Sequence, residues 1–122
     1  MALEKAHILK ADQNKTFLAS IGDEFPDWLA TVAFYRGVHL VEACFARKNI
    51  HSQRHSERND RLKRDYPKLW MEFKPLYEAS RMVRYTERCI STREAREQLI
   101  AKRLPALEAL VNAQLDSPPT KA

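Results

Sequence analysis

Apolar side chains recur at spacings of three and four residues along most of this chain, which is the period of an α-helix with one buried face. The pattern predicts a first helix over residues 3–21 and a second over residues 26–48. It predicts another helix from residue 67 onward and a last one after residue 91. Residues 56–66 are almost entirely polar, and they predict a short helix that faces solvent or a ligand.

Residues that start and stop helices support these boundaries. Gly22 is placed for a left-handed end of the first helix, and Pro26 suits the first turn of the second. Asn49 is available to cap the C-terminal end of the second helix. We expect Ser52 or Ser56 to cap the polar helix, because a serine hydroxyl can accept a hydrogen bond from a free N–H group of the first turn.

Two prolines and a capping box mark the C-terminal half. Pro75 is expected to kink or break the fourth helix, because proline cannot donate a backbone hydrogen bond. Ser91 and Glu94 have the spacing of a capping box, which predicts the start of the last helix. Pro105 lies inside that helix and is expected to bend it.

The second predicted helix is apolar around nearly its whole circumference, which is typical of a helix buried by neighbours on several sides. Its polar exceptions, Arg36, His39 and Glu42, recur every three residues, and Tyr35 lies one turn before His39. These residues could form the floor of a pocket in which Glu42 orients His39. Alternatively, they could form an internal hydrogen-bond network, because buried polar groups must be paired.

The composition favours one helical domain. The 122 residues are 44% hydrophobic and 30% charged, and only two are glycine, so glycine-rich phosphate loops and tight hairpins are nearly excluded. We predict an all-α, antiparallel four- to five-helix bundle with a buried central second helix, over residues 1–116, and a disordered tail over residues 117–122. The predicted buried residues are Trp28, Phe34, Val38, Val41, Phe45, Trp70, Phe73 and Leu107.

Three features bear on location and assembly. Charged residues near the N-terminus and the lack of a long uncharged stretch predict neither a signal peptide nor a membrane span. Cys44 and Cys89 form no C-x-x-C pair, which indicates a reducing compartment, so we expect a cytoplasmic protein. The last helix has a heptad-like stripe that would serve a homodimer, which we expect, or equally the packing of neighbouring helices. Its residues are Ile100, Leu104, Leu107 and Val111.

Positive charge is concentrated in two segments. The first basic segment, residues 47–64, has seven basic and two acidic residues, and the second basic segment, residues 81–103, has seven and three. Arginine dominates both, and its planar guanidinium group suits phosphate. The segments therefore predict a phosphate-bearing partner such as RNA, although long arginine side chains also serve simply to solvate helix surfaces.

Part of the chain resembles the HEPN superfamily of small helical-bundle proteins. The resemblance covers roughly residues 28–85 and rests on Trp28, Phe34-Tyr35, His39 to Ala43, His51, His55 to Asn59, Leu76-Tyr77, Ser80-Arg81 and Arg84-Tyr85. It implies a protein that commonly dimerises. It also implies either a metal-independent ribonuclease or a partner in a toxin, defence or nucleotidyltransferase system.

The ribonuclease motif of that superfamily is absent. The motif is an arginine, usually followed by a polar residue, and then a histidine after four to six intervening positions. Arg58-Asn59 matches its beginning, but no histidine stands at that spacing, and Arg47 and His51 have only three residues between them. The family's active site therefore cannot be transferred to this chain.

His55 and Arg58 are the remaining catalytic candidates, together with His39. His55 and Arg58 are three residues apart, so they share a helix face, and they supply a group that titrates near neutrality and a cation for phosphate. The predicted nucleic-acid-binding residues are Arg54, Arg58, Asn59, Arg61, Arg64, Arg81, Arg84 and Tyr85.

No metal or cofactor is expected. His51 and His55 have the H-x-x-x-H spacing of a metal site, but no cluster of thiols or carboxylates nearby completes four ligands. The alternative to RNA binding is a non-enzymatic partner subunit of a toxin or defence-type complex, whose arginines would neutralise an acidic protein. The partner-subunit alternative thus uses the same arginines as RNA binding but directs them to an acidic protein.

Overall fold

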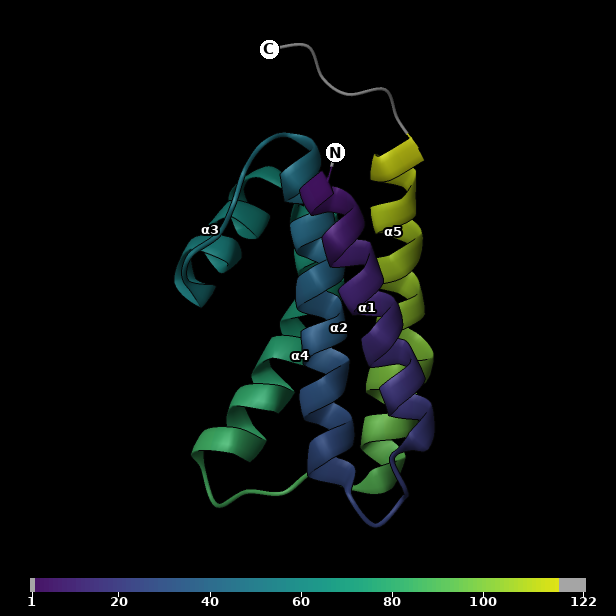
Figure 1. The fold of residues 1–122 in the computed structure, drawn as a ribbon. Helices are drawn as coiled ribbons and strands as arrows, with labels where there is room; N and C mark the ends of the chain where they lie inside the picture. Colours follow the sequence, from purple (N-terminus) through teal and green to yellow (C-terminus); the bar gives the residue numbers. More distant parts are fainter. Residues whose placement is uncertain (1, 117–122) are drawn as a thin grey trace.

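The computed structural model describes residues 2–116, and helices account for all of its regular structure in this range (Figure 1). Five are α-helices: α1 (Ala2–Ser20), α2 (Pro26–Arg47), α3 (His55–Asp65), α4 (Pro67–Tyr85) and α5 (Leu104–Asp116). The sixth, η1 (Glu94–Arg103), is a π-helix that leads directly into α5. The predicted all-α helical bundle is confirmed, whereas the predicted disordered tail lies outside the described residues.

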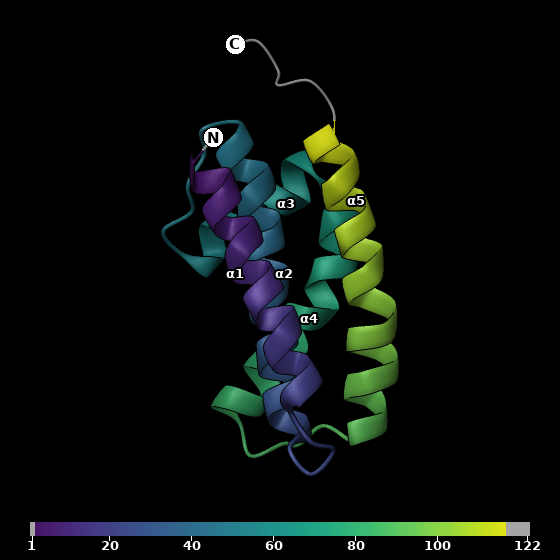
Figure 2. The ribbon, with the colours of Figure 1, turned by 45° about the vertical axis from the view of Figure 1, so that its right-hand side comes forward.

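Helix α2 lies at the centre of the bundle. It contacts α1, α4, η1 and α5, and successive long helices run in opposite directions along it (Figures 1 and 2). Helix α3 stands apart from the others and packs beside α4. This position follows from its sequence, since Leu62 is its one fully buried apolar residue.

The close packing around α2 depends on Gly37. A Cβ atom at this position would lie 3.0 Å from Leu76 of α4 and 3.5 Å from Leu107 of α5. Glycine therefore lets two neighbouring helices approach α2 at one level of the core. By length and composition α2 could cross a membrane, but most of it is buried inside the bundle, as expected for a core helix.

Five of the eight predicted core residues are buried: Phe34, Val41, Phe45, Phe73 and Leu107. Val38 and Trp70 are only partly buried, although both pack against the core. The prediction for Trp28 is wrong, because its side chain is 59% exposed. It lies in the first turn of α2, at the end of the bundle beside the loop from α1, and only part of its ring is covered there.

The helix ends match the predictions in part. Asn49 follows α2 with a φ of 59°, so the predicted left-handed cap is confirmed there, whereas Gly22 has no positive φ. The predicted caps of α3 are wrong: the helix begins at His55, and its N-cap Arg54 makes no side-chain hydrogen bond. Instead, the Glu57 carboxylate accepts a hydrogen bond from the backbone N–H of Gln53, 3.2 Å away.

The C-terminal half contains the predicted capping contact and one unpredicted element. The backbone N–H of Glu94 donates to the Ser91 hydroxyl at 3.0 Å, as the capping box requires. Pro75 does not interrupt α4, which continues from Pro67 to Tyr85. Ahead of Pro105 the helix widens to the π form, and the N–H of Leu104 bonds the carbonyl five residues before it. The wider turn makes room for the proline ring, which would otherwise clash with the carbonyl four residues earlier.

Candidate nucleic-acid interface

A buried carboxylate on α2 fixes the first basic segment. The Arg58 Nε atom donates to Glu42 Oε2 at 2.8 Å, and the backbone N–H of Ser52 donates to Oε1 at 3.2 Å. Both side chains of the ion pair are more than nine-tenths buried. Glu42 therefore ties α3 and the connection before it to the central helix. Since burial strengthens charge-assisted hydrogen bonds, this contact is a fixed part of the structure.

The same guanidinium group holds His55. Arg58 Nη1 donates to His55 Nδ1 at 2.8 Å, so Nδ1 must act as the acceptor and the proton of the neutral ring is on Nε2. Burial, followed by the positive charges of Arg58 and Arg84, lowers the pKa of His55. The ring packs against Phe34, with centroids 5.6 Å apart, and against Tyr77. His55 and Arg58 are therefore together, as the sequence predicts, and His55 is held in its neutral form.

His39 has a different partner. Its Nδ1 atom lies 3.0 Å from Nδ1 of His7 on α1, so one of the two rings donates an N–H to the lone pair of the other. Burial lowers the pKa of both rings. Glu42 makes no hydrogen bond with His39, contrary to the pocket-floor interpretation, and Arg36 pairs with Glu108 of α5. Arg36, His39 and Glu42 are therefore each paired with a residue of another element, which favours the interpretation of internal pairing over that of a pocket floor.

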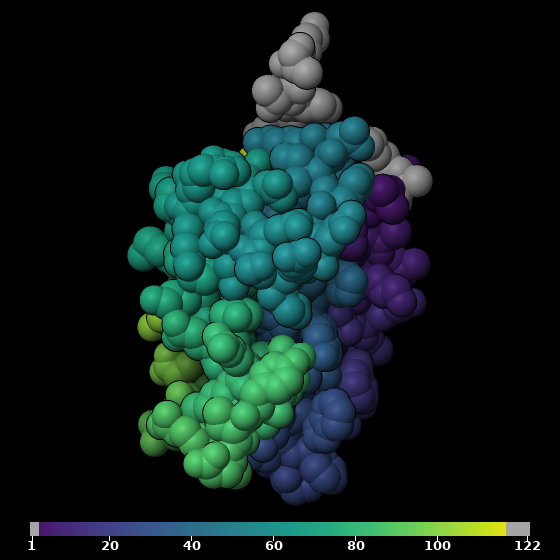
Figure 3. All heavy atoms as spheres, turned by 90° about the vertical axis from the view of Figure 1, so that its left-hand side faces the viewer, coloured from purple at the N-terminus to yellow at the C-terminus, as the bar shows by residue number. Residues whose placement is uncertain are grey.

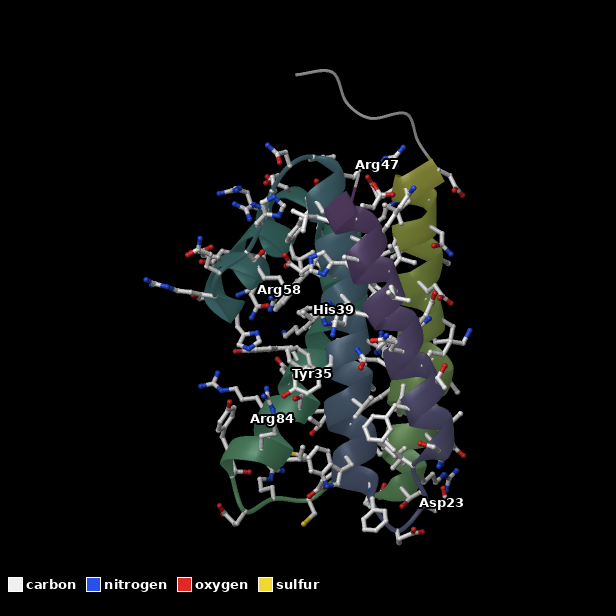
Figure 4. The ribbon with its side chains drawn as sticks, viewed as in Figure 1. Asp23, Tyr35, His39, Arg47, Arg58 and Arg84 are labelled. Carbon is white, nitrogen blue, oxygen red and sulfur yellow. The ribbon has the colours of Figure 1, made fainter. Side chains whose placement is uncertain are left out.

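Arg84 brings the second basic segment to the same face. Its guanidinium carbon lies 5.4 Å from the Phe34 ring centroid and 5.7 Å from that of Tyr35, and Nη1 donates to the Tyr35 hydroxyl at 3.3 Å. Figure 4 shows Arg58, His39, Tyr35 and Arg84 one below another beside α2. Because His55 and Arg84 pack against the same Phe34 ring, the two basic segments meet here.

Tyr85, next to Arg84, presents an aromatic face. Its side chain is 71% exposed, and the Arg84 guanidinium lies 5.0 Å from the ring centroid. An exposed ring beside a cation suits stacking with an unpaired base together with contact to its phosphate.

A second meeting point is the groove between α3 and α4, which we call the α3–α4 groove. Its volume is about 330 Å³. Lys63 from the first basic segment and Arg81 from the second both line it, and Figure 3 shows the face where α3 lies above α4. The other lining residues are Ser56, Asn59, Asp60, Trp70, Lys74, Tyr77 and Glu78.

The remaining predicted contact residues differ in their availability. Arg54 is exposed on the connection before α3. Arg64 is exposed and pairs with its neighbour Asp65 at 3.1 Å. Arg61 is half-buried, with its guanidinium 5.5 Å from the Phe45 ring centroid, and Arg58 and Asn59 are buried. The buried position of Arg58 corrects its predicted role as a phosphate contact, because its donors are directed to Glu42 and His55.

Other arginines of the second basic segment hold helices together. Arg96 binds Asp23 and the carbonyl of Ile21, which anchors η1 to the loop between α1 and α2. Arg103 binds Glu72 of α4 at 3.2 Å. These contacts place two of the segment's six arginines outside the candidate interface.

Sequence reasoning missed His7 and most of the α3–α4 groove. His7 lies one helix away from its partner, and its neighbours in sequence give no sign of the pairing. Lys63 and Trp70 are seven residues apart, and the Lys63 ammonium lies 4.9 Å from the Trp70 ring centroid. The pairing depends on the turn between α3 and α4, which local periodicity does not describe.

The histidines do not assemble into a metal site within residues 2–116, where no group of three or more His, Cys, Asp or Glu side chains is arranged to hold an ion. His51 precedes α3, so the H-x-x-x-H spacing does not place His51 and His55 on one helix face. Neither protein-family models, nor curated proteins, nor solved structures match this chain.

Proposed function

We propose that this protein binds single-stranded RNA through the face built by α3 and the C-terminal half of α4. The observation that carries the proposal is the meeting of the two basic segments, which contribute Lys63 and Arg81 to one groove. Residues 18 positions apart in sequence thereby bring positive charge to one groove, which Lys74 also lines. Such a surface suits a polyanion better than isolated arginines on unrelated helix faces do.

Roles can be assigned to the residues of this face. Arg54, Lys63, Arg81 and Arg84 supply positive charge for the phosphates, and Tyr85 supplies a ring for base stacking. Arg58 is a positioning residue, because it connects Glu42 to His55. His55 then presents its Nε2–H as a hydrogen-bond donor.

The geometry favours binding over cleavage at His55. A general base needs a free nitrogen lone pair, and the Nδ1 lone pair already accepts a hydrogen bond from Arg58. A general acid needs the protonated ring, which the lowered pKa disfavours near neutral pH. In the proposed complex, His55 therefore holds the RNA rather than transferring its proton.

Salt-dependent binding of a fluorescent single-stranded RNA tests the proposal. We expect affinity to fall steeply with salt, and Lys63→Ala and Arg81→Ala each to weaken binding and to reduce the log–log salt slope by about 0.7 per lost phosphate contact. Arg93→Ala is the matched control, because Arg93 is exposed at the N-cap of η1 and lies outside the groove. The absence of binding at low salt, or equal losses in all three variants, would contradict the proposal.

A His55→Ala variant separates binding from cleavage. If the wild-type protein cleaves RNA in the presence of EDTA and this variant does not, His55 carries a catalytic role in addition. We expect no such cleavage from either protein and a modest loss of affinity in the variant. The HEPN resemblance, which includes His55 and Arg58, is retained as a proposal of membership in a binding branch of that superfamily.

An exposed apolar hollow favours the second candidate function, that of a helical partner subunit in a toxin or defence-type complex. Phe17, Phe25 and Trp28 are each more than half exposed and line a hollow of about 400 Å³ at the end of the bundle. Exposed aromatic side chains of this kind are typical of interaction sites.

Trp28→Ser tests the partner hypothesis, with Met71→Ser, another exposed apolar residue, as the control. On isolation from the native host, we expect an acidic partner protein to be retained by the control and lost from Trp28→Ser. Sedimentation of the purified protein tests the homodimer in the same two variants. A monomeric wild-type protein would contradict the homodimer.

A further inference from the structure

The α3–α4 groove contains a buried amide that lacks a hydrogen-bond partner. Asn59 is 93% buried, and among the described residues its Oδ1 atom accepts no hydrogen bond. Its side chain nevertheless lines the groove. An unpaired buried carbonyl oxygen is unfavourable, so a ligand that supplies a donor at this point gains from pairing with it.

We propose that the α3–α4 groove binds an adenine base of the RNA, an inference that rests on the proposed function. An amide side chain can pair with adenine through two hydrogen bonds: Oδ1 accepts from the N6 amine, and Nδ2 donates to N7. Because Oδ1 is buried, binding requires the amide to turn this edge toward the groove by rotation about its terminal side-chain torsion, which is broad for asparagine. The groove has about 330 Å³, which lies in the ordinary range for small-ligand sites.

The other lining residues fit an amine-bearing base. Asp60 and Glu78 offer carboxylate oxygens that can accept the second hydrogen of the N6 amine, and they would repel the carbonyl at the same place in uracil. Trp70 and Tyr77 offer aromatic surface to the larger purine ring. Cytosine also bears an amine, but its single ring covers less of that surface.

The phosphate contacts of such a nucleotide are also present. Lys63, Lys74 and Arg81 line the same groove, so a base inserted beside Asn59 places its phosphate among three cations. The Lys74 ammonium is 3.8 Å from the Glu78 carboxylate, both side chains being exposed, and it can move to a phosphate at little cost. The base and phosphate sites are therefore part of one groove rather than two separate patches.

Homopolymer binding provides the test. We expect the wild-type protein to bind an oligoadenylate of twelve nucleotides about tenfold more tightly than an oligouridylate of the same length, as one bidentate amide contact implies. Asn59→Ala should lower the affinity for oligoadenylate about tenfold, and the affinity for oligouridylate by much less, so that the preference is lost. Asn112→Ala, an exposed asparagine on α5, is the matched control. A thermal melt of each variant establishes that it is folded.

The outcomes separate this inference from the proposed function. Equal binding of oligoadenylate and oligouridylate, or a preference for oligocytidylate, overturns the adenine site and leaves RNA binding intact. A preference that persists in Asn59→Ala also overturns it. Failure to bind any oligonucleotide at low salt overturns both. Competition by AMP, GMP, CMP and UMP in the wild-type protein gives the same answer without a variant: AMP must be the strongest competitor.

Discussion

The two basic segments are alike in composition and different in use. In the first, residues 47–64, Arg58 points inward to the Glu42 carboxylate on α2, while Arg54 and Lys63 are exposed. In the second, residues 81–103, Arg96 and Arg103 bind carboxylates on other elements. The arginines of this segment that we assign to the RNA, Arg81 and Arg84, lie on α4. The position of the carboxylates therefore decides which arginines are available to a ligand.

The comparison also separates two energetic situations. The Arg58 and Glu42 side chains are 9% and 6% exposed, so each charge depends on the other to replace its lost hydration. The Arg96 pair is far more exposed, and water screens it. Removing one partner should therefore have a much larger effect in the first segment.

Glu42→Ala is expected to cause the largest loss of stability. It leaves the buried Arg58 guanidinium without its counter-charge and frees the N–H of Ser52, so the free energy of unfolding should fall by about 3–5 kcal/mol. Urea denaturation followed by circular dichroism measures this change. Arg64→Ala, which breaks the exposed pair with Asp65, is the control and should leave the midpoint unchanged. A small effect of Glu42→Ala would mean that the pair contributes little.

The sequence predicts the frame of the molecule but not this pair. The apolar circumference of α2 and the Ser91 capping box are local signals, and both are reproduced in the structure. The contact from Arg58 to Glu42 joins residues 16 apart, across a connection whose path no local pattern determines. The basic residues of the first segment look alike in the sequence, and only the folded arrangement distinguishes the buried one.

Trp28 and His39 show the same limit at two other positions of α2. Trp28 has the helical spacing of a core residue, but it lies beyond the level at which neighbouring helices cover α2. His39 belongs to the predicted polar stripe, yet its partner is His7, 32 residues earlier. Periodicity identifies which face a residue occupies and leaves open what covers that face.

The histidines provide a second way to test the comparison, because all four belong to the first segment or to α1 and α2, and none lies in the second segment. Burial lowers the pKa of His7, His39 and His55 below the ordinary value of 6.5. As the pH falls below 6.5, the unfolded chain takes up protons before the folded protein does, so the free energy of unfolding must decrease.

Urea denaturation between pH 7.5 and pH 5 measures this loss of stability. A His39→Phe variant removes one of the three groups and its hydrogen bond with His7, and its stability should vary less with pH over the same interval. Chemical-shift titration of the histidine rings gives an independent reading. Stability that rises toward pH 5 would show that the rings gain charge on folding and would contradict the lowered pKa values.

The smallest expected effect compares two pairs within the second segment. Arg103 and Glu72 are 28% and 19% exposed and join η1 to α4, whereas Arg93 and Glu97 are 85% and 60% exposed and lie on one helix. Arg103→Ala should lower the free energy of unfolding by about 1 kcal/mol, and Arg93→Ala should have no measurable effect, since exposed pairs are hydrated and screened. Thermal melts at low and high salt measure both.

Salt should reduce the effect of Arg103→Ala only in part, because the pair is mostly shielded from solvent. If Arg103→Ala instead lowered the free energy of unfolding as much as Glu42→Ala, the ion pairs of the two segments would contribute equally to stability. If neither arginine variant changed the free energy of unfolding, the ion pair between η1 and α4 would stabilise the fold no more than an exposed pair within one helix does. We expect the loss of stability in Arg103→Ala to lie between that of Glu42→Ala and that of Arg93→Ala. This order follows because Arg103 joins two helices but its charge is not fully buried.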